Sequence, residues 1–249
     1  MSLYSANAIV LYHQDLGDAD KIITLMSREY GKIKAVARGV KRPRNRLIGG
    51  TQLFTYSEFL LFKGRQLDNI SQCQIKESFF RIRDDFKKLA YTSYMAELVN
   101  EFVPEKQKNE EVFFLFLKTL YWILKNDDIE LITRFFEIKL LLLTGILPYM
   151  DSCINCKASL DDEVEIYFKP SEGGFVCSNC CSIRENNLQI QKGTLNLLKF
   201  LSEIKYEQLD LVKLTPNLIQ ELEKILRICI ANYLEKKLKS LTFLDKIKL

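Results

Sequence analysis

The sequence contains a single histidine, His13, and none of the short motifs that build nucleotide-hydrolysing sites. Without a Gly-x-x-x-x-Gly-Lys-[Ser/Thr] loop, no P-loop ATPase or GTPase is expected. Gly-x-Gly-x-x-Gly and Gly-x-Ser-x-Gly are absent too. The paired acidic residues fall at expected turns and helix ends, where Asp is a common cap, so they do not indicate a two-metal nuclease. We therefore expect a protein that is not an enzyme.

Long apolar runs are also missing, and the most apolar stretch is only Leu140–Leu143. That is far short of the roughly 20 residues that cross a bilayer. The first residues have no basic segment leading into an apolar one, so no secretory signal and a cytosolic location are expected. In that compartment the seven cysteines are not expected to form a disulfide framework. With 249 residues, 47% hydrophobic, the chain can bury a substantial core.

The first 78 residues show short runs of β-forming residues separated by glycine-containing turns. Five such runs are present, at residues 8–12, 21–26, 32–38, 54–62 and, more weakly, 67–75. Five short strands with almost no helix between them indicate a small barrel, and the five-stranded OB-fold fits this count. We expect residues 1–78 to form an OB-fold.

From residue 79 the apolar period changes to the i, i+3, i+4 spacing of amphipathic helices. Helices are expected at 79–102, ended by Pro104, and at 112–124, 130–143, 193–204 and 216–239. The predicted class is thus α+β: an N-terminal OB-fold barrel at 1–78, then an α-helical domain at 79–249 that carries a four-cysteine insertion.

Four cysteines form two Cys-x-x-Cys pairs, Cys153/Cys156 and Cys177/Cys180, with a hairpin-like arm between them. Two thiolates from each tight turn can complete a tetrahedron around one ion, which predicts one structural Zn²⁺ per chain at zinc knuckles spanning 153–180. Four thiolates leave no open position for catalysis. Buried cysteines without metal are the competing interpretation, and Cys181 is an alternative ligand to its neighbour Cys180. The remaining two, Cys73 and Cys229, are expected in the core.

No acidic residue occurs between Gly31 and Ser57, while seven cations lie in that window: Lys32, Lys34, Arg38, Lys41, Arg42, Arg44 and Arg46. The last four surround Pro43 and Asn45 and are expected on a loop that follows a strand. Loops between OB-fold strands clamp nucleic acid, and their cations neutralise phosphates. These seven residues are the predicted DNA-binding set, with a solvated loop as the alternative. Of the nearby aromatics Phe54, Tyr56 and Phe59, each is more often a core residue than a stacking platform.

The stretch from Leu16-Gly17-Asp18 to Leu25, followed by Gly31-Lys32-Ile33 to Arg42, resembles the N-terminal signature of the bacterial RecO family. The resemblance continues in Phe136–Leu141 with Gly145 and Pro148, and in Gly173–Cys177. It covers about residues 6–180, with a weaker helical tail. This chain departs from the family pattern at Asp18, at Asn45-Arg46 and at Lys157, and some members lack the cysteines.

The resemblance implies a recombination mediator located with the nucleoid in the cytoplasm. Such a protein binds single- and double-stranded DNA and anneals complementary strands. With RecR it helps load RecA onto DNA coated by single-stranded-DNA-binding protein (SSB). Neither recombination nor these partners follows from the composition or spacing of the residues.

RecO-like proteins are expected to bind the acidic, apolar-tipped tail of SSB, which needs an apolar groove with a cation at its rim. The expected helix at 130–143 offers Phe135, Ile138 and Leu142 on one face, with Arg134 and Lys139 able to reach its edges. Arg134 and Lys139 are the predicted partner-binding residues. A core helix with snorkelling cations is the alternative interpretation.

Two other function classes remain. A zinc-ribbon adaptor would bind proteins through its helices and use the basic loop for RNA or non-specific anchoring, and it would show no preference for annealing complementary DNA. A metal-dependent nuclease would cleave DNA with Mg²⁺, which the closed four-thiolate set and scattered acids disfavour.

Overall fold

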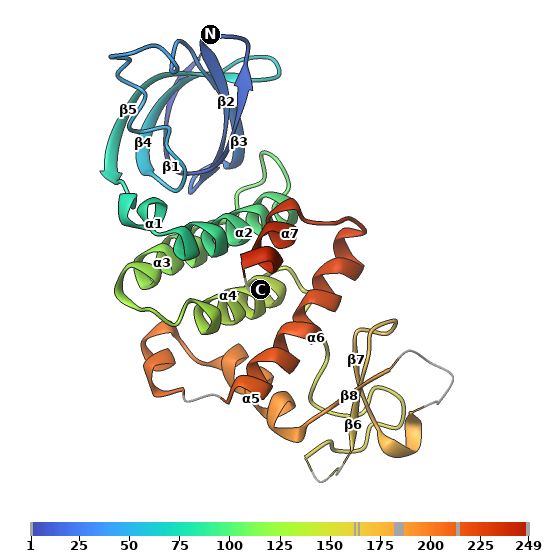
Figure 1. Ribbon diagram of the computed structural model, residues 1–249. Helices are drawn as coiled ribbons and strands as arrows, with labels where there is room; N and C mark the ends of the chain where they lie inside the picture. The colour runs from blue at the N-terminus through green and yellow to red at the C-terminus, as the bar shows by residue number, and fades with distance from the viewer. Residues whose placement is uncertain (1, 162, 164, 182–186, 213–214, 248–249) are drawn as a thin grey trace. The chain divides into compact units, whose positions relative to one another are not determined.

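The structure is a computed structural model that describes residues 2–161, 163, 165–181, 187–212 and 215–247 (Figure 1). The chain forms two compact units, one comprising Met1–Ile129 with Leu238–Leu249 and the other Glu130–Lys237. No helix in the described ranges is both long and apolar enough to cross a membrane.

The first unit begins with a closed five-stranded barrel, drawn in blue to cyan in Figure 1. Its strands are β1 (Leu3–Leu16), β2 (Asp20–Ser27), β3 (Gly31–Ala37), β4 (Tyr56–Phe62) and β5 (Asp68–Glu77). They follow the order β1-β2-β3-β5-β4, and only the β3–β5 pair is parallel. The expected OB-type barrel is confirmed.

The β1 strand is much longer than the predicted segment 8–12. Its first half pairs with β4 and its second half with β2, and the register shifts between Val10 and Tyr12. Such a bulge bends a strand and lets it take part in both sides of a closed barrel. Inward-facing side chains fill the interior, among them Val10, Leu25 and Phe59.

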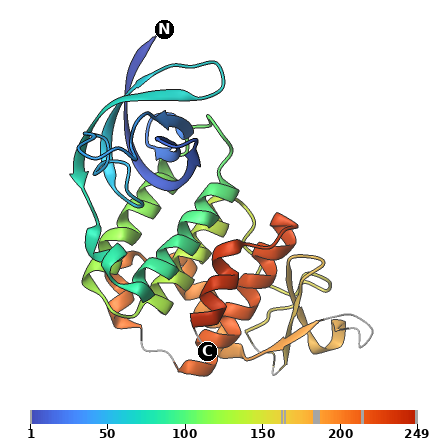
Figure 2. The same cartoon turned by 45° about the horizontal axis from the view of Figure 1, so that its top comes forward.

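Helices α1 (Phe80–Asp84), α2 (Phe86–Phe102) and α3 (Glu110–Lys125) complete the first unit together with α7 (Lys239–Ile247). The single helix expected at 79–102 is divided at Asp85, whose extended backbone ends α1 and whose carboxylate accepts a hydrogen bond from Lys88 N at the start of α2. α7 lies against α2 (Figure 2), where the rings of Phe86 and Phe243 meet edge to face at 5.7 Å.

The second unit contains α4 (Ile129–Leu143), α5 (Lys192–Glu203) and α6 (Pro216–Leu234), with a 3₁₀ turn at Tyr206–Leu211. A three-stranded sheet of order β7-β6-β8 is formed by β6 (Ile166–Lys169), β7 (Gly174–Cys177) and β8 (Leu188–Ile190). The helix predicted to reach residue 239 ends at Leu234, because Glu235 adopts a left-handed conformation with φ of 50°. The helical remainder with an inserted cysteine-bearing sheet is therefore confirmed.

Candidate metal centre and nucleic-acid interface

Two tight turns carry the paired cysteines in the second unit. In the first turn, Cys153 N donates to Ala158 O and Lys157 N donates back to Cys153 O at 2.9 Å, with Lys157 in the left-handed region at φ 63°. Ile154 N donates to Phe175 O of β7, which fixes this turn beside the strand that ends at Cys177. A 3₁₀ turn, Ser178–Cys180, then places the fourth cysteine, Cys180, close to the other three.

The Sγ atoms of Cys153, Cys156, Cys177 and Cys180 all lie within 4.8 Å of one another. The Cys156 and Cys177 sulfurs are 3.7 Å apart. Zn–S bonds of about 2.3 Å in a tetrahedron place the sulfurs about 3.8 Å apart, so the spacing fits a four-thiolate metal site. The four predicted ligands are brought together as one set.

The environment of Cys153 favours a thiolate even though its side chain is buried. Burial opposes ionisation, but backbone hydrogen bonds from Cys156, Cys177 and Asn155 outweigh it and lower the pKa of the Cys153 thiol to about 6. Hydrogen bonds with the Cys156 and Cys177 side chains raise the pKa of Cys180 to about 12. Without an ion, four sulfurs so close together cannot all be charged, and a bound cation would remove this conflict.

The other three cysteines lie outside this set. Cys181 accepts a hydrogen bond from Asn187 Nδ2 at 3.5 Å, so Cys180 and not Cys181 completes the cluster. Cys229 is buried in α6 as predicted, and burial raises the pKa of its thiol to about 12. Cys73 is half-buried and packs against the barrel core.

The acid-free segment between β3 and β4 forms a chain of tight turns across one end of the barrel. Val40 and Leu47 insert into the barrel core, with exposures of 7% and 8%. The Asn45 side chain fastens the segment, because its Nδ2 donates to Arg38 O at 3.0 Å and its Oδ1 accepts from Leu47 N at 2.8 Å. We refer to this segment between β3 and β4 as the basic loop. Its apolar side chains Val40 and Leu47 point into the barrel, and its cations face solvent.

The cations of the basic loop, the segment between β3 and β4, are exposed: Arg38, Lys41, Arg42, Arg44 and Arg46. Lys41 Nζ lies 2.8 Å from the Asp15 carboxylate. Within the described ranges no carboxylate lies at ion-pairing distance from Arg38, Arg42, Arg44 or Arg46. Arg38 Nε donates to Asn69 Oδ1 at 3.2 Å, and the guanidinium groups of Arg42, Arg44 and Arg46 are available for an anionic ligand.

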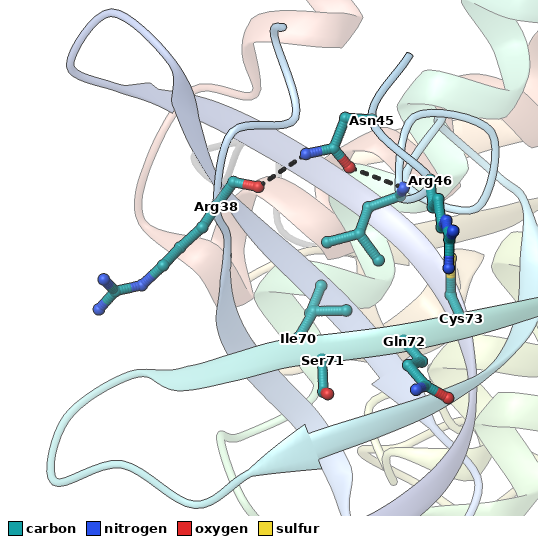
Figure 3. Close-up of a pocket in the computed structure, with 8 residues that line it drawn as sticks. Arg38, Asn45, Arg46, Ile70, Ser71, Gln72 and Cys73 are labelled. Atoms are coloured by element: carbon teal, nitrogen blue, oxygen red, sulfur yellow. Dashed lines mark hydrogen bonds between the residues drawn. The ribbon is translucent and has the colours of Figure 1, made fainter.

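A cavity of about 640 Å³ opens between the basic loop and β5. Figure 3 shows Arg38 and Arg46 on opposite sides of Asn45, with Ile70, Ser71 and Gln72 of β5 beneath them. The lining thus supplies two arginines, a serine hydroxyl and a glutamine amide, which are groups that bind phosphodiesters by charge and by hydrogen bonds.

The structure places Lys32 and Lys34 away from the basic loop. Lys32 is 8% exposed, and its ammonium group donates to the backbone carbonyl of Asn100 in α2. Lys34 lies 2.5 Å from the Glu105 carboxylate. Both line a separate cavity of about 610 Å³ on the outer face of β1, β2 and β3. Of the seven cations, only those from Arg38 onward gather at the barrel end.

Two of the three aromatic residues near the basic loop are core residues and not stacking platforms. Phe54 and Phe59 are fully buried, and half-buried Tyr56 packs edge to face on Phe113 at 5.9 Å. The core alternative is thus the correct one for both phenylalanines.

Arg134 and Lys139 occupy different environments on α4. Arg134 is 1% exposed. Its Nε lies 3.0 Å from the Glu137 carboxylate, although the two groups are not aligned for a hydrogen bond. Its Nη1 lies 3.6 Å from the Glu223 carboxylate. Half-buried Lys139 donates to Ser202 O at 2.6 Å. The predicted position of Arg134 at the rim of a groove is wrong, because its charge is held in the interior by carboxylates. A peptide contact at Lys139 stays a prediction.

Asn45, Ser71 and Gln72 were not recognised from the sequence. Asn45 was visible only as a spacer between arginines, although an Asn within a turn commonly bonds the nearby backbone. Ser71 and Gln72 carry no local signal, because the parallel β3–β5 pairing that brings them beside Arg38 joins distant segments.

Comparisons with known proteins cover almost the whole chain. The family model described as "Recombination protein O N terminal" matches residues 1–79, and "Recombination protein O C terminal" matches residues 83–242. The chain is 41% identical to the "DNA repair protein RecO" of Pelotomaculum thermopropionicum, over 99% of this chain and 95% of that protein. It is 38% identical to the protein of the same description in Symbiobacterium thermophilum, over 100% and 99%. The chain therefore belongs to the RecO family of DNA repair proteins, which are recombination mediators and not enzymes.

Proposed function

We propose that this protein binds single- and double-stranded DNA through the basic loop of its barrel and anneals complementary strands. The observation that carries the proposal is the pinned, acid-free loop, whose four arginines have no carboxylate partner among the described residues. Cations that an intramolecular acid does not neutralise are the groups that bind phosphates and release counterions. In this proposal DNA binding belongs to residues 1–78 and the helical domain to residues 79–249, whereas the compact units divide the chain at residues 129 and 238.

In this proposal the protein acts in the nucleoid with RecR, and the two help load RecA onto DNA coated by SSB. Family membership and the DNA repair description of the relatives support it. Docking of the SSB tail is assigned to the second unit, with Lys139 as a contact. Leu142, 47% exposed on the same helix, offers an apolar neighbour.

We also assign one structural Zn²⁺ to Cys153, Cys156, Cys177 and Cys180. The candidate ligands are four cysteine sulfurs, with no carboxylate or histidine in the set. Such a set suits a borderline-soft cation such as zinc better than calcium or magnesium, which prefer oxygen ligands. The ion would join the turn at 153–158 to the end of β7 and so stabilise the small sheet. We assign the zinc ion a structural role only and no part in a reaction on DNA.

A strand-annealing assay with two complementary labelled oligonucleotides, naked or coated with SSB, tests the proposal. The protein should accelerate annealing, and Arg42→Gln with Arg44→Gln and Arg46→Gln should abolish most of the acceleration. The same assay with non-complementary strands and with RNA separates annealing from non-specific anchoring by an adaptor. If the unmodified protein binds DNA without accelerating annealing, the proposed function is incorrect.

A further inference from the structure

A second cationic cavity lies at the β2–β3 turn of the barrel, and its lining reaches Asp68 of β5, two residues before Ile70 in the lining of the cavity at the basic loop. It measures about 550 Å³ and is bordered by the β2–β3 turn, the start of the β4–β5 connection and the segment between α2 and α3. β3 begins at this cavity and ends at Ala37, one residue before Arg38 of the basic loop. Seven residues at about 3.3 Å each separate the two ends by roughly 20 Å. We refer to it as the lysine cavity, after Lys63, Lys106 and Lys108 in its lining.

The lysines of this cavity are positioned to attract an anion. All three are exposed. Lys108 lies 3.2 Å from the Glu110 carboxylate. Across the described part of the chain, no carboxylate lies at ion-pairing distance from the ammonium groups of Lys63 and Lys106. The ammonium groups of Lys63 and Lys106 are therefore not held in ion pairs and can contact an anionic ligand.

The two acidic residues of the lining are occupied by hydrogen bonds within the protein. Glu29 accepts from the backbone N and the side-chain Nδ2 of Asn7, at 2.9 and 2.7 Å. Asp68 accepts from Gly64 N at 2.9 Å and from the Tyr4 hydroxyl. Both carboxylates keep their negative charge, so the lining has three lysines against two acids, and neither acid forms an ion pair with Lys63 or Lys106.

An aromatic side chain stands beside these lysines. Tyr30 is 44% exposed, and its ring meets that of Tyr4 edge to face at 4.9 Å and 74°. Because Tyr4 is held by Asp68, it fixes the orientation of the Tyr30 ring. A half-exposed, oriented aromatic ring next to cations is the combination on which bases of single-stranded nucleic acid stack.

The cavity wall is built rigidly. Gly31 has φ of 70°, and a Cβ there would lie 1.8 Å from Gln107 O, so the segment between α2 and α3 lies directly against the β2–β3 turn. Lys106 adopts φ of 59°, and its N–H donates to Lys32 O at 3.0 Å. Holding a non-glycine residue in a left-handed backbone conformation costs free energy. Residues with such strained conformations cluster at functional sites.

We propose that the lysine cavity binds a second strand of single-stranded nucleic acid, with phosphates on Lys63 and Lys106 and a base stacked on Tyr30. The inference rests on the proposed annealing function, since annealing requires two strands to be held together. The basic loop holds one strand and the lysine cavity holds the other, on the same barrel.

The test measures co-binding of two non-complementary oligonucleotides to the full chain. The first strand carries a donor fluorophore and is bound at saturation, and the second carries an acceptor and is titrated. Lys63→Gln with Lys106→Gln should weaken capture of the second strand about tenfold and leave first-strand affinity within about twofold. Tyr30→Ala should weaken second-strand capture about fivefold, and Tyr30→Phe should behave as the unmodified protein.

Lys118→Gln with Lys125→Gln on α3 is the matched control, because it removes the same charge from exposed positions of the same unit. Far-ultraviolet circular dichroism verifies that each variant is folded. Unchanged second-strand capture in the Lys63/Lys106 variant would overturn the proposal. Equal weakening of both strands would also overturn it, because one continuous path would then serve a single strand. Displacement by an acidic peptide without any capture of the second oligonucleotide would identify a protein ligand instead.

Because the strands are non-complementary, the measurement is independent of annealing. If two strands are captured but complementary strands do not anneal faster, the proposed function fails while the second site stands. If annealing occurs and the Lys63/Lys106 variant captures and anneals normally, the proposed function stands and the second site fails.

Discussion

Removing the three arginines at the tip of the basic loop should change how DNA affinity depends on salt. The perturbation is Arg42→Gln with Arg44→Gln and Arg46→Gln. All three side chains are exposed, and no described carboxylate pairs with them. Each phosphate contact on a single strand contributes about 0.7 to the slope of log affinity against log salt, so losing three contacts flattens it by about 2. Between about 50 and 200 mM salt, the unmodified protein should lose about 20-fold more affinity than the variant.

Fluorescence anisotropy with a labelled oligonucleotide, repeated over a salt series, measures this slope. Lys41→Gln provides a graded comparison, because its ammonium already pairs with Asp15 at 2.8 Å and should contribute less than one of the arginines. Lys118→Gln with Lys125→Gln again controls for net charge. Equal slopes of log affinity against log salt for the triple variant and the unmodified protein would refute the reasoning. DNA would then contact other residues of the protein.

Three further perturbations follow from the structure. Cys153→Ser should reduce bound zinc from about one ion per chain to near none in elemental analysis and lower the melting temperature, whereas Cys181→Ser should retain the ion. Arg134→Met should lower the free energy of unfolding in urea by about 3–5 kcal/mol, because it leaves buried carboxylates without their cation; adding Glu137→Met should restore part of the loss, and an additive double variant would contradict this account. Asn45→Ala removes two hydrogen bonds that fasten the basic loop, so it should cost about 1–3 kcal/mol and weaken DNA binding several-fold in the same anisotropy assay.

The barrel and the cysteine cluster were predictable because their signals are local. Alternation of side chains marks a strand within a few residues, and each Cys-x-x-Cys pair is confined to one turn. The division of the first long helix at Asp85 was not visible, since the apolar period continues through it. The end of α6 was also missed, because Glu235 takes a left-handed conformation that the sequence usually marks with glycine.

The fate of individual cations was not predictable, because their partners are distant in sequence. Arg134 and Arg42 are the same residue type, yet the first is paired with Glu223 in another helix and the second is exposed. Lys34 lies in the same acid-free window as Arg38, but Glu105, which follows α2, neutralises it. Charge density along the chain locates a basic segment, and only tertiary contacts decide which of its members stay available.

The first unit is discontinuous, because residues 130–237 of the second unit intervene before α7 returns to it. During synthesis the barrel strands leave the ribosome before the second unit, whereas α7, which packs on α2, leaves it after that unit. A nascent chain that has just passed residue 237 already holds every segment of the second unit, but its α2 still lacks Phe243 beside Phe86 and Ser240 beside Glu97. The unit that starts first is thus the last to be completed. Truncation of the final helix should consequently expose the α2 surface and loosen the support of the N-terminal half, far from the deletion in sequence.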